Sequence, residues 1–176
     1  MKRIVLMTPL FMACLFAFSG CGQERRPDGM PPLHLCRITI IQDGQPLEGA
    51  IVTLHNTGQG TNWGSSGTTA ASGVADIFTQ GQYKGAPEGN YKVTVRKEET
   101  VSLATPEQLA AIEKAKAENP KWFDPPRIKQ ETWQLVEKQY TDDKETPLEL
   151  VISSGKNNIE FDLGKAVRER MEDNTE

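Results

Sequence analysis

Apolar and polar residues alternate most clearly over residues 90–97, directly after a Pro- and Gly-containing turn. The apolar positions are Tyr91, Val93 and Val95, and Asn90, Lys92 and Thr94 lie between them. This period of two is typical of a β-strand with one buried face. Pro87 fixes its own φ, and Gly89 accepts backbone angles that other residues resist, so both favour a turn before the strand. A strand of this kind needs a second sheet to cover its apolar face.

The same alternation predicts further strands at 35–41, 50–55, 74–79, 148–153 and 158–163. The stretch 56–67 is polar and rich in glycine, so we expect a loop there, and we expect 154–157 to close a hairpin between the last two strands. The positions expected to face inward are Cys36, Ile38, Ile40, Ala50, Val52, Leu54, Ala75, Ile77, Tyr91, Val93, Val95, Leu148, Leu150, Ile152, Ile159, Phe161 and Leu163. At about 1.5–3 kcal/mol for each large side chain, this burial offsets much of the cost of ordering the backbone.

Residues 98–146 interrupt the strand pattern and read as a long insertion. Thr105 can cap a helix, Pro106 suits the first helical position, and Gln108 stands where a capping box places Glu or Gln. These signals predict a short helix over 106–118. A short strand is expected at 135–140, and the charged tail 165–176 suggests one or two helical turns.

The N-terminus carries the features of an export signal. Lys2 and Arg3 precede an apolar run over 4–18, and small residues follow it. A run of about 15 residues is short for a bilayer span, which needs about 20. We therefore interpret 1–20 as a signal peptide rather than a transmembrane anchor. The polar stretch 21–34 reads as a flexible tether.

The end of this signal resembles the lipobox of bacterial lipoproteins, on Phe18-Ser19-Gly20-Cys21. Phe18 departs from the leucine that usually opens the box. The resemblance implies that Cys21 becomes the acylated N-terminus and that two or more acyl chains hold the protein on a membrane. It places the chain in the cell envelope, on the periplasmic side or the outer surface.

Three turn-and-strand segments resemble the carboxypeptidase regulatory-like domain family. They are Gly44-x-Pro46-Leu47-x-Gly49-Ala50-x-Val52-x-Leu54, Thr68-Thr69-x-x-Ser72-Gly73-x-Ala75-x-Ile77 and Ala86-Pro87-x-Gly89-x-Tyr91-x-Val93-x-Val95. Ala70 stands where the family usually has Asp. The resemblance implies a mainly β fold, a transthyretin-like Greek-key β-sandwich of about seven strands, over one domain at 35–164. It also implies a module without catalytic activity.

Composition excludes several other classes. The net charge is −4 and no basic stripe with interleaved aromatics appears, which argues against a nucleic-acid partner. Of the three cysteines, Cys14 lies in the signal peptide and Cys21 directly follows it, so only Cys36 is left for the folded body. A disulfide within the body and a zinc site with two or more body cysteines are therefore excluded. Cys36 is in register with the core, where a small buried hydrophobe is favoured over a redox thiol.

The sequence offers little for catalysis. His34 and His55 are the only histidines, and neither lies in a recognisable motif. Asp142, Asp143 and Glu145 lack the spacing of a calcium loop and read as a solvated turn. We expect no enzyme, no cofactor and no metal site. A small hydrolase built on the two histidines is the least favoured function.

Four aromatic residues form the candidate binding surface: Trp63, Trp122, Phe123 and Trp133. They can cover the end of the sandwich and pin the insertion onto it, or they can form a recognition surface. The favoured function is a structural or protein-binding role at the envelope, and the alternative is a carbohydrate-binding module. The expected partners are the membrane, through acylated Cys21, and an envelope protein or glycan.

Overall fold

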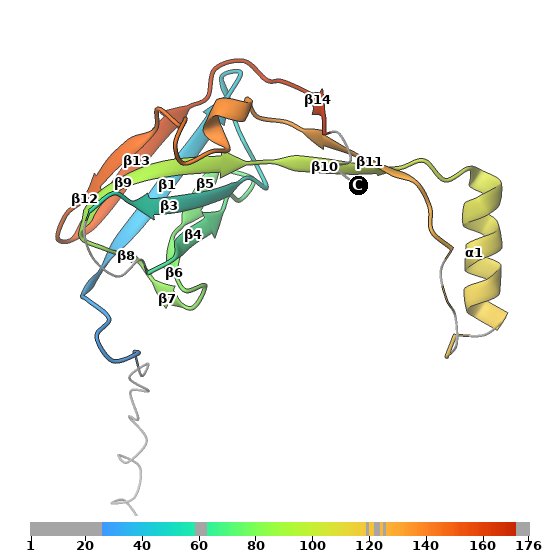
Figure 1. The fold of residues 1–176 in the computed structure, drawn as a ribbon, viewed down its shortest axis with the longest axis horizontal. Helices are drawn as coiled ribbons and strands as arrows, with labels where there is room; N and C mark the ends of the chain where they lie inside the picture. The colour runs from blue at the N-terminus through green and yellow to red at the C-terminus, as the bar shows by residue number, and fades with distance from the viewer. Residues whose placement is uncertain (1–25, 59–62, 119, 122–123, 125, 172–176) are drawn as a thin grey trace, which may run out of the picture. The chain divides into compact units, whose positions relative to one another are not determined.

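The structure is a computed structural model that describes residues 26–58, 63–118, 120, 121, 124 and 126–171. The chain divides into two compact units, Met1–Met30 and Pro31–Glu176. The expected signal peptide and Cys21 lie outside the described residues. Those that are described form a mainly β protein with three sheets and one α-helix (Figure 1). Among them, no helix combines the length and the apolar character that crossing a membrane requires.

The first sheet is built around β1 (Leu33–Gln42). β13 (Lys156–Asp162) pairs with β1 in parallel, and three short strands pair with it antiparallel. The short strands are β2 (Gln45–Pro46), β5 (Val74–Asp76) and β8 (Ala86–Pro87). β1 begins two residues earlier than expected, so Leu33 and His34 belong to the sheet and not to a tether. The pairing with β8 at these two residues is what extends the strand.

The second sheet has the order β12-β9-β3-β4-β6-β7, and all its pairs are antiparallel. Its strands are β12 (Glu149–Ile152), β9 (Gly89–Arg96), β3 (Ile51–Asn56), β4 (Ser65–Thr68), β6 (Phe78–Thr79) and β7 (Tyr83–Lys84). In β9 the expected apolar positions Tyr91, Val93 and Val95 are all buried. The alternation around residue 90 therefore identified a central strand of the sheet.

One hydrophobic core lies between these two sheets. It joins Ile38 and Ile40 of β1 to Leu54 of β3 and to Val93 and Val95 of β9. The positions that we expected to face inward belong to this core or, at Ile159 and Phe161, pack against it half-buried. The prediction of a mainly β chain with one shared core is confirmed.

Two connections differ from the sequence expectation because the chain changes sheet. β12 belongs to the second sheet and β13 to the first, so 154–157 links the sheets and does not close a hairpin. The stretch 74–79 is not one strand. Ile77 interrupts it, and β5 pairs with β1 whereas β6 pairs with β4.

β4 was expected to lie in a loop, but Ser65–Thr68 pairs with both β3 and β6. Its sequence, Ser-Ser-Gly-Thr, carries no apolar alternation that could have marked it. Gly67 leaves room here, because a Cβ at this position would lie 2.4 Å from the carbonyl oxygen of Asp76. The absence of a side chain lets β4 approach β5 across the sandwich.

The third sheet contains β10 (Glu98–Ser102), β11 (Gln130–Gln134) and β14 (Glu169–Arg170), paired antiparallel in that order. Helix α1 (Pro106–Glu118) follows β10 and has the bounds that the capping signals predict. The strand expected at 135–140 is wrong, since β11 ends before it and a 3₁₀ turn, η1 (Lys138–Tyr140), occupies its second half. The helical expectation for the tail is also wrong at 169–170, because these residues pair with β11.

Candidate functional site

The segment from β10 through α1 to β11, residues 98–135, is called the arm below. None of the arm residues that the structure describes belongs to the hydrophobic core. Its root is fixed by two hydrogen bonds at Leu135. The amide of Leu135 donates to the carbonyl of Lys97 at 2.9 Å, and its carbonyl accepts from the Gln42 side chain at 3.0 Å. The two sheets therefore close around their core without the arm.

Local chemistry defines the start of helix α1. The amide of Gln108 donates to the hydroxyl of Thr105 at 3.2 Å, and the Gln108 side chain accepts from the amide of Thr105 at 2.9 Å. This reciprocal pair is the capping box that the sequence predicts. The helix buries none of its residues, and Leu109 is 48% exposed.

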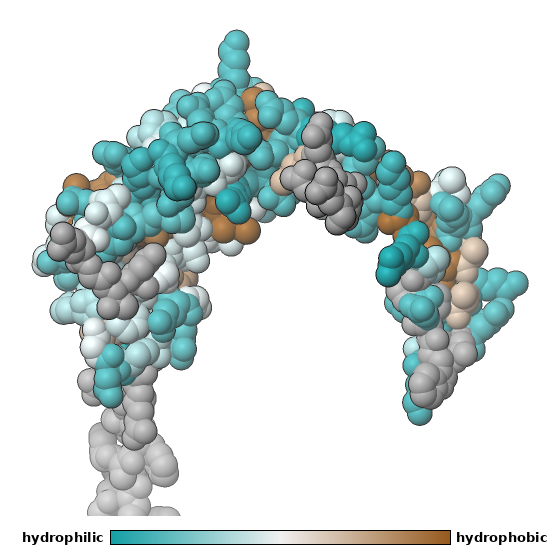
Figure 2. Space-filling model, viewed as in Figure 1, coloured by the Kyte–Doolittle hydropathy of each residue, from teal (hydrophilic) through white to brown (hydrophobic). Residues whose placement is uncertain are grey.

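A cavity of about 710 Å³ lies between α1 and the chain that returns toward β11. It is called the arm groove below. Its apolar lining comes from Leu103, Ala111, Ile112, Ala115, Pro126 and Ile128. Its polar lining comes from Gln108, Asp124, Arg127 and Lys129. Apolar surface is visible on this part of the molecule in Figure 2. The groove can hold an apolar segment with polar flanks, as concave binding sites commonly do.

The expected aromatic surface is described only in part. Trp133 lies in β11, where the Arg168 guanidinium covers its ring at 4.7 Å from the centroid and also pairs with Glu99 at 3.1 Å. Trp63 is half-buried beside β4, and its carbonyl accepts a hydrogen bond from the Ser65 hydroxyl. Trp122 and Phe123 lie outside the described residues. A recognition surface made by all four aromatics therefore stays a prediction.

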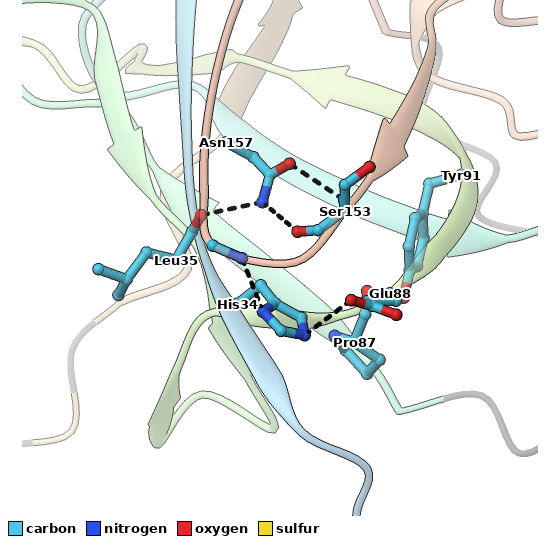
Figure 3. Close-up of polar contacts among 8 residues, drawn as sticks. His34, Leu35, Pro87, Glu88, Tyr91, Ser153 and Asn157 are labelled. Atoms are coloured by element: carbon cyan, nitrogen blue, oxygen red, sulfur yellow. Dashed lines mark hydrogen bonds and ion pairs between the residues drawn. The ribbon is translucent and has the colours of Figure 1, made fainter.

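Both ring nitrogens of His34 have a partner, and Figure 3 shows its surroundings. Its Nδ1 accepts a hydrogen bond from the amide of Gly155 at 3.0 Å, and its Nε2 lies 3.2 Å from Glu88. Because Nδ1 accepts, the proton of the neutral ring lies on Nε2 and points to the carboxylate. Nearby, the Tyr91 hydroxyl donates to the carbonyl of Pro87 at 2.9 Å. His34 thus ties the start of β1 to the turn before β9 and to the link between β12 and β13.

These partners of His34 were missed from the sequence. Gly155 lies 121 residues away, and only the change of sheet between β12 and β13 brings it to the start of β1. Glu88 belongs to the turn that precedes β9. The sequence predicted that turn, but it did not predict that the Glu88 side chain points toward His34. With both ring nitrogens engaged, His34 acts here as a clamp between segments.

The remaining candidate groups are separate from His34. His55 lies on β3, with Nε2 2.9 Å from the hydroxyl of Thr94 on β9. The Asp142 carboxylate accepts from the amide of Lys144 at 2.8 Å, which is a local turn contact. Over the described ranges, no cluster of three or more His, Cys, Asp or Glu residues is placed to hold a metal ion.

Cys36 is buried in the core at 2% exposure. Burial raises the pKa of its thiol to about 11. The thiolate is therefore disfavoured near neutral pH, and Cys36 behaves as a small apolar side chain. The expectation of a buried hydrophobe at this position is confirmed.

Comparison with known proteins assigns no family. No family model and no curated protein matches the chain. Among solved structures, the chain is similar to BcpA, the major pilin subunit of Bacillus cereus, with 13% identity and a TM-score of 0.38. That match covers 76% of this chain and spans 30% of the pilin chain. At this level of similarity, it assigns neither an activity nor a partner.

Proposed function

We propose that this chain is a lipid-anchored β-sandwich of the cell envelope that binds another envelope protein and catalyses no reaction. In this proposal, Cys21 carries the acyl chains and the sandwich is a carboxypeptidase regulatory-like, transthyretin-like module. The arm provides the binding surface. The lipobox-like junction supports the anchor, and the three turn-and-strand segments support the family.

The separation of the arm from the core is the observation that carries the binding role. The core that the first two sheets share contains none of the described residues of 98–135, so this segment has surface left for a partner. Long insertions in compact domains commonly serve binding. The arm groove gives this insertion a concave apolar surface, and a partner segment with apolar anchors at helical spacing would suit it.

Mass spectrometry of the mature protein tests the anchor. We expect an N-terminal peptide that begins at Cys21 and carries the mass of a diacylglyceryl group. The Cys21→Ser variant should lose this mass and leave the membrane fraction. A mature chain that starts elsewhere, or that carries no lipid, would contradict the anchor.

Site-specific photo-crosslinking in cells that produce the protein tests the arm groove. A photoreactive residue at Ile112 should give one defined crosslinked species, because this position lines the groove. The matched control is Glu113, the next residue of the helix, which is exposed and is not part of the lining. Successive helical residues point about 100° apart, so the two probes sample different surfaces. Equal yields at both positions, or none at Ile112, would contradict binding through the groove.

A further inference from the structure

A small charged pocket lies on the outer face of the first sheet, near the start of β1. It has a volume of about 270 Å³ and includes Arg37, Asp76, Lys84, Lys156 and Asn158 in its lining. The β-sheet register explains why these charged and polar side chains lie together. Arg37 of β1 pairs with Asp76 of β5 on one side and with Asn158 of β13 on the other. Residues that pair across a sheet share one face, so these three side chains form a row.

Asp76 holds two of the cations in place. Its Oδ1 accepts from Arg37 Nε at 2.8 Å, and its Oδ2 accepts from Lys84 Nζ at 3.0 Å. The hydrogen bonds from Lys84 and Arg37 lower the pKa of the Asp76 carboxyl, so it is ionised at neutral pH. Both of its oxygens are engaged, and it orients Arg37 and Lys84 at the rim of the pocket.

Several hydrogen-bond donors remain available in this pocket. Arg37 contacts Asp76 through Nε, which leaves its two terminal nitrogens. Lys84 contacts it through one bond of an ammonium group that can donate three. The Lys156 side chain forms no ion pair or hydrogen bond with any residue that the structure describes.

The charge in the pocket is positive although the chain is acidic. Three cations face one carboxylate, whereas the whole chain has a net charge of −4. Sites for larger organic ligands usually measure about 300–1,000 Å³, so a pocket of this size suits one small group. Because the pocket is small and carries excess positive charge, it favours a compact anion.

We propose that this pocket binds a single phosphate-type oxyanion through Arg37, Lys84 and Lys156. The planar guanidinium offers its terminal N–H groups to two oxygens of the anion, as arginine does at phosphates. The two lysines add charge and further donors from β7 and β13. The phosphate group can be free in solution or part of a lipid headgroup, since both present at least two non-bridging, negatively charged oxygens.

Titration of the full chain with inorganic phosphate tests the site. The chain is held in zwitterionic phosphatidylcholine nanodiscs, and sodium chloride keeps the ionic strength constant. We expect saturable shifts of the backbone amide signals of Arg37 and Asn158. An ionic contact at an exposed site is worth about 0.2–1 kcal/mol, so Lys156→Gln should weaken the phosphate affinity by up to about fivefold.

The matched control is Lys165→Gln, which removes the same charge from an exposed position outside the pocket. We expect it to leave the affinity unchanged. The Lys156 side chain has no described partner to lose, so the rest of the spectrum should be preserved in Lys156→Gln. Shifts that grow linearly without saturation, or equal losses in the two variants, would mean that phosphate acts through general charge and would overturn the proposal.

A second titration distinguishes the two sources of the phosphate group. If the pocket binds lipid headgroups, nanodiscs in which phosphatidylglycerol replaces part of the phosphatidylcholine should shift the same amide signals. A response to inorganic phosphate alone assigns a soluble ligand, and a response to phosphatidylglycerol alone assigns a lipid. Either response must weaken in Lys156→Gln, and no response to either probe overturns the proposal.

Discussion

Single polar side chains join segments of this protein that are far apart in the sequence. The Thr146 hydroxyl donates to the carbonyl of Val93 across 53 residues, at 2.6 Å. The Asn157 side chain donates to the carbonyls of Ser153 and Leu35 and so fixes the link between the sheets. No buried side-chain nitrogen or oxygen of the described residues is left without a partner. Because an unpaired buried polar group costs about 1–3 kcal/mol, these contacts help to specify the topology.

The buried thiol of Cys36 gives a prediction at this scale. We expect iodoacetamide to modify it far more slowly in the native protein than in denaturant at about pH 8, because the thiolate is the reactive form. The measurement is the rate of modification of the Cys36 peptide by mass spectrometry, with Cys36→Ala as the control for assignment. Equal rates in native and denatured protein would show that the thiol is accessible.

The same thiol makes stability depend on pH in one direction. The pKa of Cys36 is raised in the folded state from an ordinary value of 9.0 to about 11. Folding therefore favours the neutral thiol. The contribution of Cys36 to the free energy of unfolding is fully present below about pH 9. It is lost as the pH rises through about 11. The midpoint of urea unfolding should fall more steeply over this range in the wild type than in Cys36→Ala.

At the scale of elements, the close approach of β4 to β5 depends on Gly67. A Cβ there would lie 2.4 Å from the carbonyl oxygen of Asp76, and backbone atoms cannot move aside as a flexible side chain can. We expect Gly67→Ala to lower the free energy of unfolding by about 1–3 kcal/mol, as overpacking does. Urea denaturation measures this change.

Gly64→Ala is the matched control, because a Cβ at Gly64 would meet nothing within 4 Å. It should change the free energy of unfolding by less than about 0.5 kcal/mol. Equal stabilities for the two variants would mean that β4 and β5 can separate without cost.

The elements also show which parts of the fold the sequence could predict. β1, β3 and β9 each bury apolar side chains at alternate positions, and this burial produces a period of two in the sequence. β4, β10 and β11 are largely polar strands with little or no burial of apolar side chains, so no period marked them. The prediction that β13 forms a hairpin with β12 was wrong for a different reason. Sheet membership depends on contacts with β1 that lie more than 100 residues away.

The candidate sites also differ in how far the sequence could predict them. The capping box of α1 is a contact across three residues, and the sequence predicted it. The arm groove brings Leu103 together with Asp124 and residues 126–129 beside the helix, and no spacing rule predicts that arrangement. The charged pocket depends on the register of β5 and β13 with β1. The sequence gives the charges of Arg37 and Asp76, but it does not predict that these two side chains lie next to each other.

For the whole molecule, the distribution of buried residues predicts two levels of stability. The first two sheets share one core, whereas α1 buries no residue and belongs to an arm whose described residues are all outside that core. Isolated helices shorter than about 12–15 residues are marginal in water. Pro106–Glu118 has 13 residues, so it is marginal by itself and relies on its capping box for stability.

Hydrogen exchange of the full chain measures these two levels. Local opening free energies range from near zero in weakly packed segments to the global value in the core, so amides of α1 should exchange far faster than those of β9. The comparison uses peptides from 106–118 and 89–96, followed by mass spectrometry without denaturant. Increasing urea should bring the exchange of β9 toward that of α1, because global unfolding then dominates both. Protection of α1 as strong as that of β9 would mean that a partner, or a second copy of the chain, already covers the arm. Repeating the exchange at lower protein concentration separates these cases, since only the protection given by a second copy decreases on dilution.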